Sequence, residues 1–236
     1  MTAAQCGQKQ IPSRRLSTTY VPNTGTSKRS SIATLHDTPT FNTINNMPNW
    51  CSTFYRIQGD SKELKQFNKL IQALEKRKHP LVKSDFGNLW LGCIVEKLHG
   101  NSEETYCRGY IIDYKLEDDT LSLYVESAWA EPYEWRAFIK KQYPSFQIYY
   151  MSEEGGCGYY VTNDKDGKFF PDKYLLDSDE LEQQYFTTLE EACIKIGELC
   201  DKKVDTVSDI EEALTDYSES HDNMYLQFIE YTVIDD

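Results

Sequence analysis

Long hydrophobic runs are missing from this chain of 236 residues. The longest uncharged apolar stretches, such as residues 89–95, are far shorter than the roughly 20 residues that a membrane-spanning helix needs. The N-terminus also lacks the compact apolar segment of a secretory signal peptide. These absences predict a cytoplasmic protein that has no membrane span and no membrane partner.

Paired cysteine motifs are missing as well. None of the seven cysteines has the C-x-x-C spacing, and an odd number does not suit a disulfide framework in a chain of this size. The four histidines are isolated from one another and from the cysteines, so local spacing predicts no metal site. We therefore expect free, mostly buried thiols and no cofactor, with Cys157 as the best candidate for a reactive exception.

Glycine-rich phosphate-binding motifs are absent too. Neither G-x-x-x-x-G-K-[ST] nor G-x-G-x-x-G occurs, and the glycine-rich run 155–158 has no lysine for a phosphate. The run D-x-D-G at 164–167 lacks the glutamate that would complete a calcium loop, so a polar turn is expected there. No catalytic site is recognisable, and the sequence leans towards a protein that is not an enzyme.

Negative charge is what the sequence has in excess. Residues 1–46 carry five bases and one acid, which leaves 37 acids against 20 bases in residues 47–236, a net charge of −17. The segment 201–236 alone holds eleven acids and two lysines. Because phosphate contacts need a positive field, this charge makes direct nucleic-acid binding an unfavoured interpretation.

Three regions are expected from composition and periodicity. Residues 1–46 are rich in Ser, Thr, Asn and Gln and show no apolar period, which predicts a disordered tail or leader. Residues 47–165 form the predicted core, and residues 166–236 form an acidic C-terminal extension packed on it.

The apolar patterning of the core predicts the order strand, helix, helix, strand, strand, helix, strand. Its expected elements are a strand at 52–59, helices at 60–79 and 91–98, a hairpin of 108–116 with 121–130, a helix at 132–143 and a second hairpin at 145–163. Gly100 is expected to end the second helix in the left-handed conformation. In the extension, Thr187 with Glu190 and Ser208 with Glu211 predict two helix starts, and 225–234 predicts a last strand.

Three short stretches of the core carry a family resemblance. They are Pro48-Asn49-Trp50-Cys51, the run 125–132 (VESAWAEP) and the run 143–150 (YPSFQIYY). Together they resemble the YubB-type ferredoxin-like domain family of phages, conjugative plasmids and Bacteroidetes mobile elements. The resemblance implies an α+β ferredoxin-like sandwich, mostly antiparallel with helices on one face, in a protein of the bacterial host cytosol. It implies no activity and no functional residues.

Two function classes follow. The first is a non-enzymatic acidic interaction protein, which binds a basic host protein at its nucleic-acid-binding surface by mimicking nucleic acid. Its candidate partner-binding residues are Asp209, Glu211, Glu212, Asp216 and Glu219. An alternative explanation of the negative charge is that the acids only keep the domain soluble.

The second class is a small-molecule or nucleotide binder, or an enzyme, that uses a cleft. Its candidate residues are Glu126, Trp129, Glu153, Glu154 and Cys157. Trp129 is expected to plug the layer between sheet and helix, with an exposed binding platform as the alternative. The pairs 149–150 and 159–160 are tyrosines that could stack nucleotides on an open sheet face.

Overall fold

Two β-sheets organise the part of the chain that the computed structural model describes, residues 49–235. The predicted tail 1–46 lies outside the described residues. The described residues belong to one compact unit, and the predicted boundary at 165/166 stays a prediction. None of the helices among them is long and apolar enough to cross a membrane.

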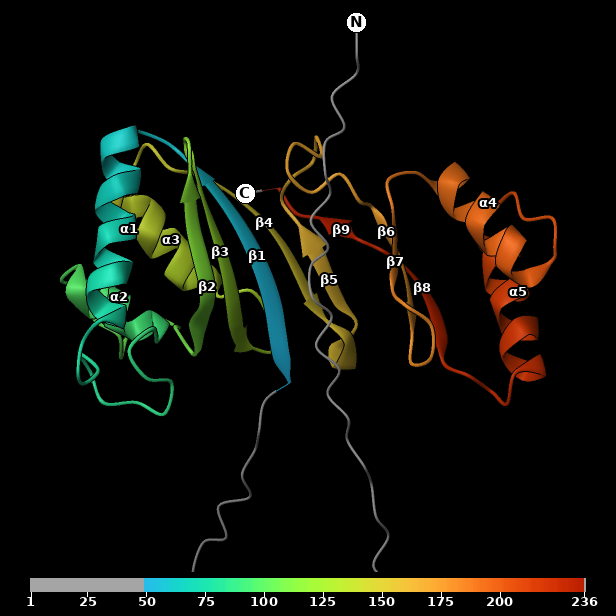
Figure 1. Cartoon of the computed structure of the whole chain (residues 1–236), viewed down its shortest axis with the longest axis horizontal. Coiled ribbons are helices and arrows are strands. Elements are labelled where there is room, and N and C mark those ends of the chain that lie inside the picture. Colours follow the sequence, from blue (N-terminus) through green and yellow to red (C-terminus); the bar gives the residue numbers. More distant parts are fainter. Residues whose placement is uncertain (1–48, 236) are drawn as a thin grey trace, which may run out of the picture. The chain divides into compact units, whose positions relative to one another are not determined.

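The larger sheet has six strands in the order β2-β3-β1-β4-β5-β9 (Figure 1). All neighbours are antiparallel except β5 and β9, which run parallel. The strands are β1 (Trp50–Gln58), β2 (Gly109–Glu117), β3 (Thr120–Ala128), β4 (Gln147–Glu154), β5 (Tyr159–Thr162) and β9 (Thr232–Val233). The predicted order of core elements and both predicted hairpins are confirmed.

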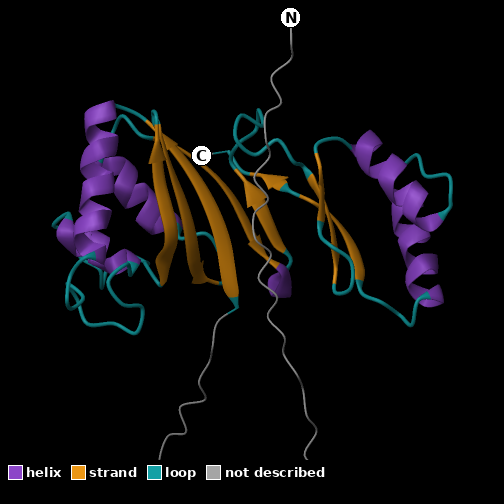
Figure 2. Cartoon of the chain, in the orientation of Figure 1, coloured by secondary structure: helices purple, strands orange, loops and turns teal. Residues whose placement is uncertain are grey.

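Three helices cover one face of this sheet (Figure 2). They are α1 (Ser61–Glu75), α2 (Leu91–Lys97) and α3 (Tyr133–Gln142). Strand β1 shows why the faces differ, because its odd-numbered residues from 51 to 57 are buried and its even-numbered ones are half-buried. The even-numbered side faces away from α1–α3, and we call it the open face, although residues of the second sheet cover it over β4 and β5.

Helix α1 begins at Ser61, one residue after the predicted start, but it ends at Glu75 and not near residue 79. The Asp60 carboxylate accepts hydrogen bonds from the backbone N–H groups of Lys62 and Glu63, at 2.9 and 3.1 Å, which satisfies donors that have no partner inside the helix. The end of α2 differs from the prediction, because His99 and not Gly100 adopts the left-handed conformation, with φ of 61°. Gly100 is instead packed closely against the ring of Phe138.

The second sheet has the order β7-β6-β8 and is packed against α4 and α5. Its elements are β6 (Tyr174–Ser178), β7 (Gln184–Phe186), α4 (Leu189–Cys200), α5 (Val207–Ser220) and β8 (Leu226–Glu230). Strands β6 and β7 were not expected from the sequence. The described chain is thus α+β, with five helices and a mostly antiparallel main sheet.

Both predicted helix starts in the extension are slightly displaced. Thr188, one residue after Thr187, caps α4. Thr206 and Asp209 form the capping box of α5, two residues before the predicted pair that begins with Ser208. In each case the capping residue and the acid lie three residues apart, as predicted. The hydroxyl oxygen that accepts the capping hydrogen bond belongs to a nearby threonine and not to the predicted residue.

The predicted last strand at 225–234 is broken at Tyr231. β8 pairs with β6 in the small sheet, whereas β9 pairs with β5 in the large one. Between them, the backbone N–H of Tyr231 donates to the Lys173 carbonyl at 2.9 Å. A single run of alternating residues therefore serves two sheets.

Candidate functional site

Two of the predicted cleft residues lie in one row across the open face. Ser52 of β1 pairs with Glu126 of β3 on one side and with Glu153 of β4 on the other. Two strand spacings separate the glutamates, which is about 10 Å between backbones. Tyr110 and Tyr160 extend the row at its two ends.

Glu126 is the acceptor of a small hydroxyl network. The Tyr110 hydroxyl donates to its carboxylate at 2.6 Å, and the Tyr124 hydroxyl donates at 3.4 Å. The Tyr124 and Ser52 hydroxyls are 3.2 Å apart. Burial raises the pKa of Tyr124, so its hydroxyl stays protonated and able to donate.

Glu153 binds the second sheet to the first. Its carboxylate accepts hydrogen bonds from the hydroxyls of Tyr231 and, at 3.4 Å, of Tyr185. Burial raises the pKa of Glu153, although these two hydrogen bonds oppose the shift. Burial also raises the pKa of Tyr185 and of Tyr231, so both hydroxyls remain donors. This carboxylate is engaged in packing the C-terminal elements.

Aromatic rings surround the row. Trp50, Phe86 and Tyr110 form a cluster with ring centroids 5.7 to 5.9 Å apart. Phe54 and Tyr124 are stacked at 4.8 Å. Such contacts stabilise beyond the area they bury, and Trp50 remains 38% exposed.

The four tyrosines predicted as a stacking platform are divided between the two faces. Tyr150 and Tyr159 pack with the core beneath the helices. Tyr149 and Tyr160 pack on the other side, and Tyr160 is buried there. These four tyrosines therefore form no common stacking platform, because neighbouring strand residues alternate in direction, and the negative charge had already disfavoured nucleotide stacking there.

Glu154 and Cys157 do not form a nucleophile with its base. The buried Glu154 carboxylate caps a short 3-10 helix (Gly155–Cys157), accepting from the backbone N–H groups of Gly156 and Cys157 at 2.8 and 2.7 Å. Hydrogen bonding to Glu154 raises the pKa of the exposed Cys157 thiol. A raised pKa disfavours the thiolate, which is the nucleophilic form.

Trp129 is exposed rather than buried, so the core-plug prediction is wrong. Its φ is 70° and the residue is 41% exposed. The left-handed turn at the end of β3 directs the indole outwards and the next acid, Glu131, inwards. The buried tryptophan of this layer is Trp135 of α3.

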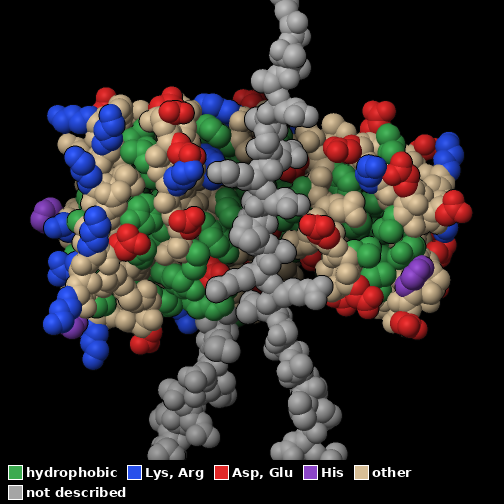
Figure 3. All heavy atoms as spheres, viewed as in Figure 1, with side chains coloured by type: hydrophobic (Ala, Val, Ile, Leu, Met, Phe, Trp, Pro, Cys, Tyr) green, Lys and Arg blue, Asp and Glu red, His purple; other side chains and the backbone are tan. Residues whose placement is uncertain are grey.

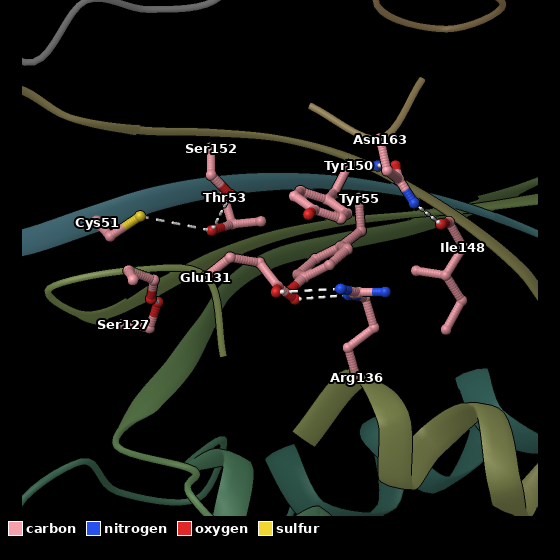
Figure 4. Close-up of polar contacts among 11 residues, drawn as sticks. Cys51, Thr53, Tyr55, Ser127, Glu131, Arg136, Ile148, Tyr150, Ser152 and Asn163 are labelled. Atoms are coloured by element: carbon pink, nitrogen blue, oxygen red, sulfur yellow. Dashed lines mark hydrogen bonds and ion pairs between the residues drawn. The ribbon is translucent and has the colours of Figure 1, made fainter. Parts of the chain in front are cut away.

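Sequence reasoning missed a buried ion pair beneath this turn (Figure 4). The Arg136 Nε donates to the Glu131 carboxylate at 2.9 Å, and the Tyr55 hydroxyl donates to the same carboxylate at 2.6 Å. The guanidinium also lies over the ring of Tyr150, 4.7 Å from its centroid. The i, i+5 spacing of an acid before a helix and an arginine inside it is the one weak signal in the sequence.

The five predicted partner-binding acids lie on or near the outside of α5. Glu211, Glu212, Asp216 and Glu219 are exposed, and Asp216 forms an ion pair with Lys202. Asp209 is partly buried, and its carboxylate accepts from the backbone N–H groups of residues 205 and 206. A hydrogen bond with Thr206 holds the pKa of Asp209 below its usual value.

The thiols are largely as predicted for the described residues. Six cysteines are free there, and four of them are buried; they are Cys51, Cys93, Cys107 and Cys193. Burial raises the pKa of Cys51 to about 12 and that of Cys107 to about 11. Cys6 lies outside the described residues.

Two cavities are lined by residues other than the five candidate cleft residues. One, of about 450 Å³, is bounded by Phe86, Trp90, Glu134 and residues 102–108. The other, of about 510 Å³, lies at the end of α4. Within residues 49–235, no three metal-ligating side chains come together.

Comparison of the chain with models of protein families, with curated proteins and with solved structures finds no match. The resemblance to the YubB-type family therefore stays a prediction.

Proposed function

We propose that this protein is a non-enzymatic interaction protein whose acidic C-terminal part binds the basic, nucleic-acid-binding surface of a host protein. The observation that carries the proposal is the unequal division of charge. Residues 47–165 hold 17 acids and 15 bases, whereas residues 166–236 hold 20 acids and 5 bases. Nearly all the net charge of residues 47–236 thus belongs to the part that forms the second sheet and its helices.

The exposed face of α5 supports this role. Its apolar side is buried against the small sheet, so the acidic side is directed to solvent. Glu211, Glu212 and Glu219 are exposed and have no ion-pair partner among the described residues. A dense carboxylate surface attracts a cationic surface over a distance and speeds encounter.

The test is capture of partners from host lysate by the immobilised full chain at low and high salt. Binding should be lost at about 1 M salt, where the screening length falls to about 3 Å. It should also be lost in the variant Glu211→Gln/Glu212→Gln/Glu219→Gln. Asp209 is left unchanged because it caps the helix.

A matched control neutralises three exposed carboxylates in residues 47–165 instead. Asp85→Asn/Glu103→Gln/Glu104→Gln changes exposed acids that accept no hydrogen bond among the described residues. This variant should capture the same partner as the unchanged chain. A partner that ignores salt and both variants would contradict the electrostatic proposal.

We further propose a ferredoxin-like core of mobile-element origin, working in the host cytosol. The strand order β2-β3-β1-β4 supports the fold assignment, since β3 lies antiparallel between β1 and β2 while helices α1 and α3 follow β1 and β3. The origin and location rest on the sequence resemblance. The proposed cytosolic location can be tested by localising a tagged chain in infected or plasmid-bearing cells.

A small-molecule or nucleotide site on the open face is the second candidate. The favouring observation is the row of Ser52, Tyr110 and Tyr124 hydroxyls around Glu126, beside the exposed Trp50. Stacking on Trp50 and hydrogen bonding to Glu126 would suit a planar ligand with N–H donors. Quenching of tryptophan fluorescence by adenosine or cytidine, absent in a Trp50→Leu variant, tests it.

A further inference from the structure

Helix α1 carries a cationic stripe. Lys62, Lys65, Lys69 and Lys76 are separated by three, four and seven residues, so they lie along the same side of the helix. All four are exposed, and the opposite side of α1 is buried in the core. The stripe is about 21 Å long at 1.5 Å per residue.

These lysines are not engaged in ion pairs within the part of the chain that the structure describes. The two acids of α1, Glu63 and Glu75, lie off the stripe, where their carboxylates accept from the hydroxyls of Ser145 and Tyr114. Lysine and arginine side chains gather over α1 in Figure 3. The stripe is an unpartnered helix face of one sign.

Helix α5 carries the reciprocal pattern. Asp209, Glu212, Asp216 and Glu219 follow one another at spacings of three, four and three residues along one side. Of these, Glu212 and Glu219 have no ion-pair partner among the described residues, whereas Asp216 pairs with Lys202 and Asp209 belongs to the capping box. The first two spacings equal those of the lysines on α1. The acids extend over about 15 Å, so the longer cationic stripe can cover the whole of the acidic one.

We propose that the α1 stripe of one copy docks on the α5 acids of a second copy. This inference rests on the proposed function, because it identifies a basic surface that the acidic part would bind. The two patches differ, so the contact is head-to-tail and leaves one free patch at each end, which allows chains of copies to grow.

A nucleic acid is the competing occupant of the stripe. A long polyanion would run beyond the four lysines and meet a protein with a net charge of −13. The α5 acids form a short array with matching spacing, and screening confines the interaction to the facing patches. These observations favour a second copy.

The proposal can be tested by mixing two variants, each of which has one of the two charged patches neutralised. One variant is neutral on α1 (Lys62→Gln/Lys65→Gln/Lys69→Gln), and the other is neutral on α5 (Glu212→Gln/Asp216→Asn/Glu219→Gln). Sedimentation of the full chain at about 0.02 M salt, where the screening length exceeds 10 Å, should show concentration-dependent association. Each variant alone should associate on the order of tenfold more weakly, as the loss of three exposed ion pairs implies.

An equimolar mixture of the two variants should form a 1:1 dimer and nothing larger, because each supplies one intact patch. Neutralising three cations of the N-terminal region, Lys9→Gln/Arg14→Gln/Arg15→Gln, is the charge-matched control and should leave association unchanged. A chain that stays monomeric at low salt, or a mixture that fails to form the dimer, would overturn the proposal.

The failure of this inference is distinguishable from failure of the proposed function. The α1 variant keeps the acidic part intact, so it should still capture a basic partner from lysate even if self-association is absent. Binding of a 20-nucleotide single strand by the monomeric chain, lost in the α1 variant, would overturn the second-copy assignment in favour of nucleic acid.

Discussion

The buried pair of Glu131 and Arg136 offers the sharpest test of how this core is held. Both side chains are nearly inaccessible, 7% and 5% exposed as residues. They are joined at 2.9 Å, and Tyr55 adds a second donor to the same carboxylate. The perturbation is Glu131→Gln or Arg136→Met, each of which keeps the volume and removes one charge.

Each single change leaves the other charge buried without its partner. The expected cost is about 3–5 kcal/mol of unfolding free energy. For a domain of this size, that corresponds to a fall in melting temperature of roughly 6 to 20 °C. The double variant Glu131→Gln/Arg136→Met leaves no net charge buried, so its cost should be well below the sum of the two singles.

Urea unfolding followed by circular dichroism gives the three free energies of the cycle. The exposed pair of Lys195 and Glu198 is the control, and Glu198→Gln should cost at most about 1 kcal/mol. Single variants of the buried pair that lose less than about 1 kcal/mol would refute the reasoning. Strict additivity in the double variant would refute it too, because it would mean that the two charges do not interact.

Three further predictions concern other groups. Asp209→Asn should lower the unfolding free energy by about 0.5–1 kcal/mol through the weakened capping box, whereas Glu212→Gln should change it by less than about 0.5 kcal/mol in urea titrations. Glu153→Ala should cost about 1–3 kcal/mol because the buried Tyr231 hydroxyl loses its acceptor, and Glu153→Gln, which restores an acceptor, should recover most of that loss in the same assay. Among the described cysteines, Cys157 should be the first alkylated under native conditions, with a rate that rises as the pH approaches its raised pKa, as mass spectrometry of the peptides can show.

Local patterns were sufficient for most elements of the core. Strand alternation and the short polar turn at 117–120 predict the hairpin of β2 and β3, and Asp60 marks the start of α1. These features depend on neighbouring residues alone. Strands β6 and β7 are short and pair with each other, but the other partner of β6 is β8, which arrives from about fifty residues away and which no local pattern records.

The candidate site was less predictable for a related reason. Glu126 and Glu153 were chosen separately, and only the strand register places both beside Ser52. The ends of elements were hardest, because one left-handed residue reverses the direction of a side chain. At Trp129 this exposes an indole that composition assigns to the core, and it buries Glu131 instead.

Tyr231 has a consequence for how the molecule opens. β8 ends at residue 230 in one ladder and β9 begins at residue 232 in the other, so a single residue joins the two ladders along the chain. Under native conditions, the amides of β6 that face β8 and those of β5 that face β9 should then exchange with solvent deuterium in one shared event. The two sheets would behave as one cooperative unit, since residues of both also share a hydrophobic cluster that includes Met151, Leu175 and Ile229.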